Sequence, residues 1–188
     1  RRIAYLIEKK LAKPSEILAL TFTEKAAAGM EERVDVLVPY GYVDTWISTF
    51  HAFGDRILRE KALEIGLPTD FQVLTKPQQI LFVQQNLFAF ELSIFRPLSS
   101  PTKFIEAILA LISRAKDENV SPQDYLQYTT TLEKKVKNSS GEEKKELEDE
   151  LLRQKELASF YAKYEELKRS SGKIDYGDQV YLTLKLLR

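Results

Sequence analysis

Apolar residues follow two different spacings in the first third of the chain. Short apolar runs at residues 17–22 and 44–49 predict two buried strands. Apolar positions at helical spacing predict helices over residues 1–12, 24–37 and 50–65. Strands and helices therefore alternate, and this order is typical of a parallel sheet with helices packed against it.

After residue 66 the spacing becomes mainly helical. Helix starts are indicated by polar residues beside prolines, at Thr75, Ser100 and Ser121. A long helix is predicted over residues 142–170, with an apolar seam along one side, and Gly172 suits its C-cap. The last residues are expected to lead into one more helix.

Composition narrows the class of protein. The chain has 188 residues, of which 44% are hydrophobic, enough for the core of one or two compact units. It has no cysteine, which excludes disulfides, thiolate chemistry and Cys-type zinc sites. No apolar run approaches the roughly 20 residues of a membrane span, and no signal peptide is visible, which favours a cytoplasmic location.

Charge changes the expectation for nucleic-acid binding. Lys+Arg and Asp+Glu are equal at 28 each, so the formal net charge is zero. A protein that binds nucleic acid by overall electrostatics would be basic. Any such binding must therefore come from local placement of charges and from stacking.

The end of the first predicted strand carries candidate chemistry. Thr21, Phe22, Thr23 and Lys25 lie where this strand leads into a helix. Ligands of open parallel sheets bind beyond the carboxyl ends of strands, and hydroxyls with free helix N–H groups suit phosphate oxygens. The ring of Phe22 could stack on a base, worth about 1–3 kcal/mol. The simpler alternative is a helix N-cap at Thr23 beside a core phenylalanine.

Thr49, Phe50 and His51 repeat this design at the end of the second predicted strand. His51 is the only histidine, so it cannot belong to a multi-histidine metal site, and no partner for a general base is visible. A histidine that only forms a hydrogen bond near a helix start is the alternative. We expect both segments at the same edge of one sheet.

The two segments together resemble a known pair of motifs. Thr-Phe-Thr-Glu-Lys-Ala-Ala followed by Ser-Thr-Phe-His-Ala-Phe is similar to the strand-end motifs of UvrD/PcrA/Rep-type superfamily 1 DNA helicases, and also of the related RecB and AddA motors. Residues 2–6 resemble the helix after the family's phosphate-binding loop, and residues 160–176 the return from its inserted helical subdomain. Glu24 replaces a common Asn, as in RecB-like relatives.

The resemblance implies a fold and its division into parts. The expected class is α/β, predominantly helical, with a partial RecA-like parallel sheet and a large inserted all-α subdomain. Residues 1–65 would be part of a RecA-like motor domain, residues 66–170 the inserted helical subdomain, and residues 171–188 the return to the motor domain.

The resemblance also implies a function, that of an ATP-dependent DNA helicase or translocase travelling 3′ to 5′. The parent protein would bind ATP and Mg²⁺ between two RecA-like domains, and its partners would be single-stranded DNA, a duplex junction and the remaining helicase domains. The residues expected to contact DNA are Thr21, Phe22, Thr23, Lys25, Thr49, Phe50 and His51. Arg33 would lie near the nucleotide, unless it is simply a solvated arginine on a helix.

The groups needed for phosphoryl transfer are missing from these residues. There is no Gly-x-x-x-x-Gly-Lys-[Ser/Thr] sequence, and no acidic pair like the family's Mg²⁺-binding motif follows Asp178. Asp175 and Asp178 are expected to act as an N-cap and a first-turn acid. Phosphoryl transfer is catalysed mostly by positioning and charge neutralisation, so we expect this chain alone to have no catalytic or metal site and no activity.

Two alternatives remain open from the sequence. The chain could come from a RecB- or AddA-type helicase–nuclease, which a downstream nuclease domain would identify. It could also be a non-catalytic helical module that keeps the shape of a motor to bind a protein partner.

Overall fold

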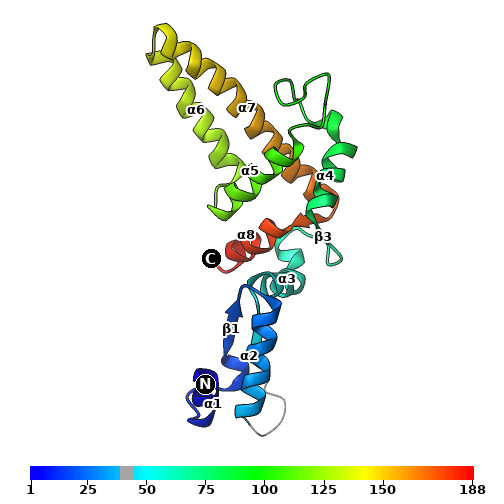
Figure 1. Ribbon diagram of the computed structural model, residues 1–188, viewed down its shortest axis with the longest axis vertical. Coiled ribbons are helices and arrows are strands. Elements are labelled where there is room, and N and C mark those ends of the chain that lie inside the picture. The colour runs from blue at the N-terminus through cyan, green and yellow to red at the C-terminus, as the bar shows by residue number, and fades with distance from the viewer. Residues whose placement is uncertain (39–44) are drawn as a thin grey trace. The chain divides into compact units, whose positions relative to one another are not determined.

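The computed structural model describes residues 1–38 and 45–188 (Figure 1). The chain forms two compact units, Arg1–Lys61 and Ala62–Arg188, and each is described by itself. No helix in the described part of the chain is long and apolar enough to cross a membrane.

In its described residues, the first unit combines two parallel strands with three α-helices and one 3-10 helix. Its elements are α1 (Arg2–Glu8), the 3-10 helix η1 (Pro14–Glu16), β1 (Leu18–Thr21), α2 (Glu24–Leu37), β2 (Trp46–Thr49) and α3 (Phe50–Glu60). In the register of β1 and β2, Leu18 lies opposite Trp46 and Thr21 opposite Thr49. The two strands therefore begin and end at the same levels, as the expected single sheet edge requires.

Two predicted helices of this unit are too long. The first helix ends at Glu8, because Lys10 adopts a left-handed backbone with φ of 53°. The helix predicted over residues 50–65 ends at Glu60, and the 3-10 helix η2 (Ala62–Ile65) follows. Asp44, the predicted start of the second strand, lies outside the described residues, and β2 begins at Trp46.

The second unit is mostly helical around a small parallel sheet. Its elements after η2 are β3 (Gln72–Leu74), α4 (Lys76–Gln85), the 3-10 helix η3 (Leu87–Ala89), α5 (Ile105–Asp117), α6 (Pro122–Asn138), α7 (Gly141–Ser170), β4 (Lys173–Asp175) and α8 (Tyr176–Leu186). Figure 1 shows α6 and α7 as an antiparallel hairpin. The predicted fold class, α/β and predominantly helical, is confirmed.

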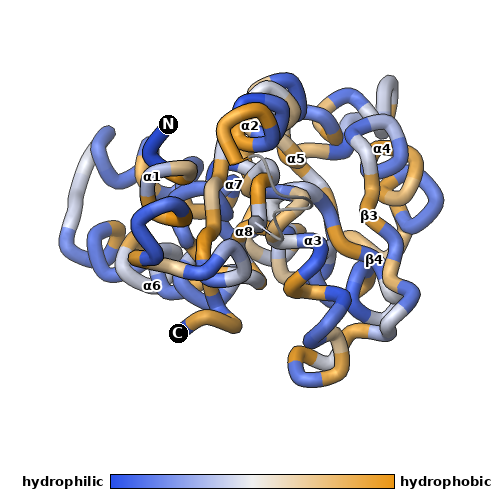
Figure 2. Tube along the Cα trace, turned by 90° about the horizontal axis from the view of Figure 1, so that it is seen from below, coloured by the Kyte–Doolittle hydropathy of each residue, from blue (hydrophilic) through white to orange (hydrophobic). Residues whose placement is uncertain are grey.

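Strand β3 has no counterpart in the sequence-based prediction. It pairs in parallel with β4, Gln72 lying opposite Lys173 and Leu74 opposite Asp175, and Figure 2 shows the two strands side by side. Helix α8 packs on α5. The last residues of the chain therefore lie in the same compact unit as the helical segment.

An aromatic core holds the second unit together. Phe160, Tyr161 and Tyr164 of α7 are almost fully buried, as the predicted apolar seam requires. The rings of Phe90 and Phe160 stack with centroids 4.3 Å apart. Aromatic pairs of this kind contribute about 0.5–1.5 kcal/mol beyond the burial of their area.

A buried carboxylate fixes the loop that precedes α5. Glu156 of α7 accepts hydrogen bonds from the backbone N–H groups of Ser93, Ile94 and Phe95, each at 2.9 Å. One side chain of α7 therefore orders three consecutive residues of this loop.

Candidate nucleic-acid interface

The two strand ends of the first unit bring two phenylalanine rings together. Phe22 follows β1 and Phe50 follows β2, directly after the paired residues Thr21 and Thr49. Their ring centroids lie 5.1 Å apart with an interplanar angle of 41°. Phe22 is 88% exposed and Phe50 is 41% exposed. The core position considered for Phe22 is therefore wrong, and the pair presents apolar ring faces to solvent.

A helix starts beside each of these rings. Thr23 caps α2 by accepting a hydrogen bond from the N–H of Ala26 at 3.2 Å. Thr49 caps α3 in the same way, accepting from the N–H of Ala52 at 3.1 Å. The first turns of two helices therefore adjoin the aromatic pair, and their remaining N–H groups are suited to phosphate oxygens.

Thr49 differs from the other predicted DNA contacts because it is buried. Its side chain is 5% exposed, and its hydroxyl donates a hydrogen bond to Oε1 of Glu24 at 3.0 Å while accepting from Ala52. Phe22, Lys25 and His51 are exposed at the same sheet edge. The hydroxyl of Thr49 thus serves contacts within the protein.

Arg33 lies apart from this group of residues. It is exposed on α2, and at about 1.5 Å of rise per residue it lies roughly 13 Å along the helix from Glu24. Thr21 is half-buried at the end of β1. The structure therefore brings the strand-end residues together and leaves Arg33 outside their cluster.

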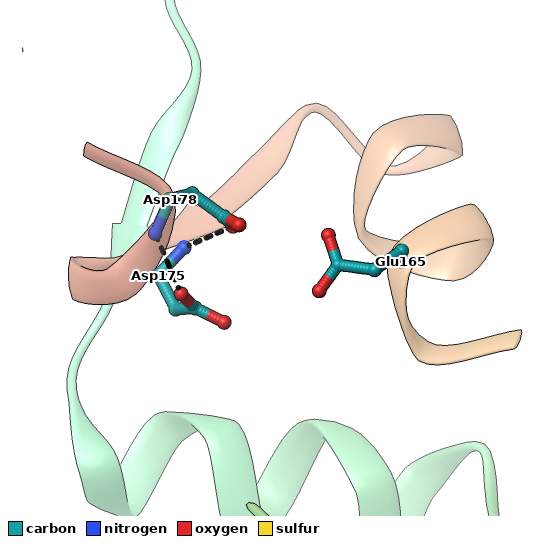
Figure 3. Close-up of side chains that lie close together, drawn as sticks. All are labelled: Glu165, Asp175 and Asp178. Carbon is teal, nitrogen blue, oxygen red and sulfur yellow. Dashed lines mark hydrogen bonds between the residues drawn. The ribbon is translucent and has the colours of Figure 1, made fainter. Parts of the chain in front are cut away.

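The second unit contains a buried ion network made of Lys116, Lys168, Glu165, Asp175 and Asp178. The Nζ atom of Lys116 lies 2.8 Å from Glu165 and 2.9 Å from Asp175. Lys168 lies 2.8 Å from the same two carboxylates and also pairs with Asp178. Figure 3 shows the three carboxylates converging from α7 and from the start of α8.

Asp175 and Asp178 also cap α8. Asp175 accepts a hydrogen bond from the N–H of Asp178 at 3.0 Å, and Asp178 accepts one from the N–H of Asp175 at 2.8 Å. This capping box confirms the N-cap and first-turn roles expected from the sequence. The hydroxyl of Tyr164 donates to Asp175 at 3.3 Å.

Opposite charges dominate the electrostatics of this network. Burial and the neighbouring Lys168 would lower the pKa of Lys116, but the carboxylates of Asp178, Asp175 and Glu165 outweigh them and raise it. Burial would raise the pKa of Asp175, but Lys168 and Lys116 outweigh it and hold that pKa far below its usual range. Lys116 and Asp175 are therefore both charged across the physiological pH range.

The three carboxylates have oxygens within 4.8 Å of one another, a spacing that could hold a cation. The ammonium groups of Lys116 and Lys168 already lie among these oxygens. A metal ion would have to displace two buried positive charges, so these residues do not fit a Mg²⁺ site. No step of phosphoryl transfer is assigned to them.

A pocket of about 630 Å³ opens beside the network, between α4, α5 and the start of α8. Its charged lining includes both signs: two cationic residues, Lys76 and Arg114, and four acidic ones, Glu106, Asp117, Glu118 and Asp175. None of the residues lining it has a buried side-chain nitrogen or oxygen without a hydrogen-bond partner. The lining therefore points to no particular ligand.

Sequence reasoning missed both lysines of the network. Lys116 is 59 residues from Asp175 along the chain, so no local spacing connects them. Both lysines lie on helices whose other charges are mostly solvated, and nothing in the sequence distinguishes them from those charges.

Known proteins similar to this chain support the resemblance found at the strand ends. Residues 1–188 match the model of the UvrD/REP helicase N-terminal domain. The chain is 33% identical to the ATP-dependent DNA helicase PcrA of Bacillus subtilis over 186 residues, which are 98% of this chain and 22% of that protein. It is 37% identical to a probable DNA helicase II homolog of Mycoplasma capricolum over 134 residues, 71% of this chain and 18% of that protein.

The chain thus spans about a fifth of the length of these relatives. A family match over every residue, together with a 33% identical relative that covers 98% of the chain, confirms the family resemblance. The chain belongs to the UvrD/REP helicase N-terminal domain family.

Proposed function

We propose that the strand ends of the first unit bind single-stranded DNA within an ATP-dependent DNA helicase. The observation that carries this proposal is the solvent-exposed Phe22–Phe50 pair, which lies at the carboxyl ends of two parallel strands in register. Exposed aromatic rings bind unpaired bases by stacking, and this mode suits a chain with no net charge. Relatives of the chain are named ATP-dependent DNA helicases.

Within this proposal the strand-end residues have different roles in binding DNA. Phe22 and Phe50 stack on bases, while Lys25 offers a positive charge to the phosphates. Thr21, Thr23, Thr49 and His51 border the path of the DNA backbone, Thr49 from a buried position. The duplex junction would be met elsewhere in the whole helicase.

The rest of the proposal concerns the whole protein. It would bind ATP and Mg²⁺ between two RecA-like domains, with Arg33 near the nucleotide, and move 3′ to 5′ along DNA. Residues 1–65 and 171–188 would belong to the first motor domain and residues 66–170 to its helical insert. The Mg²⁺ ligands would come from other residues, because the carboxylates near Asp175 are paired with lysines.

Titration of a fluorescein-labelled oligothymidylate with this chain tests the proposed interface. We expect weak, salt-sensitive binding, because this chain would supply only one of the sites that hold the strand in the whole helicase. Linked sites that share one strand bind it more tightly than one site alone. Phe22→Ala should weaken it by roughly 5- to 150-fold, the value of about 1–3 kcal/mol of stacking.

Phe88→Ala is the matched control for this titration. Phe88 is 89% exposed, and it belongs to the second unit and not to the strand ends. Its replacement should leave binding unchanged. Full-strength binding by Phe22→Ala, or an equal loss in both variants, would rule out stacking at the strand ends.

A further inference from the structure

One hydrogen bond joins the two strand ends beside the phenylalanine pair. Thr49 precedes Phe50, and its hydroxyl donates to Oε1 of Glu24, the first residue of α2, at 3.0 Å. Glu24 is two residues after Phe22. The bond therefore connects the segment that carries one ring to the segment that carries the other.

The position of this bond gives it mechanical importance. Each strand has four residues, and both rings lie beyond the last paired position, Thr21 opposite Thr49. Past that position, backbone hydrogen bonds between β1 and β2 no longer fix the distance between the two segments. The hydroxyl of Thr49 is held in turn by the N–H of Ala52 at 3.1 Å, so its direction toward Glu24 is set by the first turn of α3.

We propose that Glu24 is a positioning residue that holds Phe22 and Phe50 at stacking distance from each other. Thr49 then acts as an internal link between the strand ends. This proposal rests on the proposed function, because it assigns the bond a role in presenting both rings to unpaired bases. It predicts that the interface recognises the base itself, and that this recognition depends on the Glu24–Thr49 bond.

Four variants of Glu24 and Phe22 separate the bond from the charge. Glu24→Gln keeps an acceptor oxygen of the same reach but loses the charge, and Glu24→Ala loses both. Glu24→Asp keeps the charge on a side chain one methylene shorter, which cannot reach Thr49 from the same backbone. Phe22→Ala gives the reference for loss of stacking.

The measured quantity is the ratio of affinities for an oligothymidylate and for an abasic strand of equal length. This ratio reports stacking and cancels the effect of charge on phosphate binding. We expect Glu24→Gln to keep the ratio of the unmodified chain. Glu24→Ala and Glu24→Asp should lower it by roughly tenfold, toward the value of Phe22→Ala.

The outcomes distinguish this proposal from the one on which it rests. If the unmodified chain prefers the base-bearing strand and Phe22→Ala loses that preference, the DNA interface stands. An unchanged ratio in Glu24→Asp and Glu24→Ala would then overturn the role of Glu24 alone. If the unmodified chain shows no preference, both proposals fail. Should Glu24→Ala not fold, Glu24→Asp decides, because it keeps the acid favoured in the first turn of a helix.

Discussion

Lys116 and Lys168 have side chains that are 1% exposed, and each contacts three carboxylates. Removing one partner of a buried ion pair leaves an uncompensated charge in a region of low polarity. We therefore expect Lys116→Met to lower the free energy of unfolding by about 3–5 kcal/mol, measured by urea denaturation.

Lys163→Met is the control for that measurement. Lys163 pairs with Glu166 on the surface of α7, with both side chains at least one-third exposed. Surface pairs contribute about 0–1 kcal/mol, so this variant should unfold close to the unmodified chain. Equal effects of the two substitutions would show that burial of the network adds nothing.

The same network predicts how stability depends on pH. The pKa of Asp175 is lowered in the folded state below its ordinary value of 3.8 by Lys168 and Lys116, against the cost of burial. A carboxyl pKa that is lower in the folded state than in the unfolded state stabilises the fold at pH values above the unfolded pKa. This contribution is lost as the pH falls below about 4. Urea denaturation between pH 6 and pH 3 should show this loss, and Asp175→Asn should reduce its slope. An unchanged slope in Asp175→Asn would assign the acid sensitivity to other groups.

Gly177 lies in the first turn of α8, where its backbone passes close to Lys116. A Cβ atom at this position would lie 2.9 Å from Cδ of Lys116, whose head group is held by the ion network. We expect Gly177→Ala to destabilise the chain, because overpacking costs about 1–3 kcal/mol and a better helix former returns only about 1 kcal/mol.

Gly29→Ala is the contrasting substitution, also measured by thermal or urea unfolding. Gly29 lies inside α2, and a Cβ there would meet nothing within 4 Å. Alanine should stabilise that helix by about 0.5–1 kcal/mol. If alanine destabilised the chain at both glycines, the stabilisation expected at Gly29 from helix propensity would be contradicted. The loss at Gly177 could then not be assigned to contact with Lys116.

At the scale of helices and strands, capping residues allowed several helix boundaries to be predicted from the sequence. Thr75 with Gln78, and Ser121 with Asp124, form capping boxes at the predicted starts of α4 and α6. The long helix was also predicted within one residue: it runs from Gly141 to Ser170, and Gly172, next to its C-cap Ser171, has a positive φ of 61°. Local chemistry fixes these boundaries, so local sequence reveals them.

Strand β3 could not be predicted from local sequence. It has three residues, and its partner β4 lies about one hundred residues later in the chain. A three-residue strand has too few positions to show alternation, and its formation depends on a distant segment. The contact between Phe22 and Phe50 was foreseeable only as a shared sheet edge, whereas the Glu24–Thr49 bond depends on side-chain geometry that spacing does not give.

The capping box of α6 provides a test at this scale. The hydroxyl of Ser121 accepts from the N–H of Asp124 at 3.1 Å, and Asp124 accepts from the N–H of Ser121 at 2.9 Å. Ser121→Ala should cost about 1 kcal/mol by urea denaturation, the usual effect of losing an N-cap. Ser170→Ala, at the last residue of α7, should cost less, and the opposite order would contradict the capping argument.

At the scale of the whole molecule, binding and catalysis should separate. The residues of this chain offer a stacking surface, but its buried carboxylates are paired with lysines and no phosphate-binding loop sequence occurs in it. We expect no ATP hydrolysis above background in a phosphate-release assay with single-stranded DNA. Turnover that rises in proportion to the concentration of the chain would contradict this expectation.

The parallel pairing of β3 with β4 brings the two ends of the long helical segment between them beside each other. Residues 75–172 leave one strand and return to its neighbour, which is about 4.8 Å away in a sheet. Evolution could therefore lengthen, shorten or exchange this segment without moving either strand, provided that a crossover of about a dozen residues remains. Any replacement would still have to supply two cations in place of Lys116 and Lys168, or else lose Asp175 and Asp178 with them.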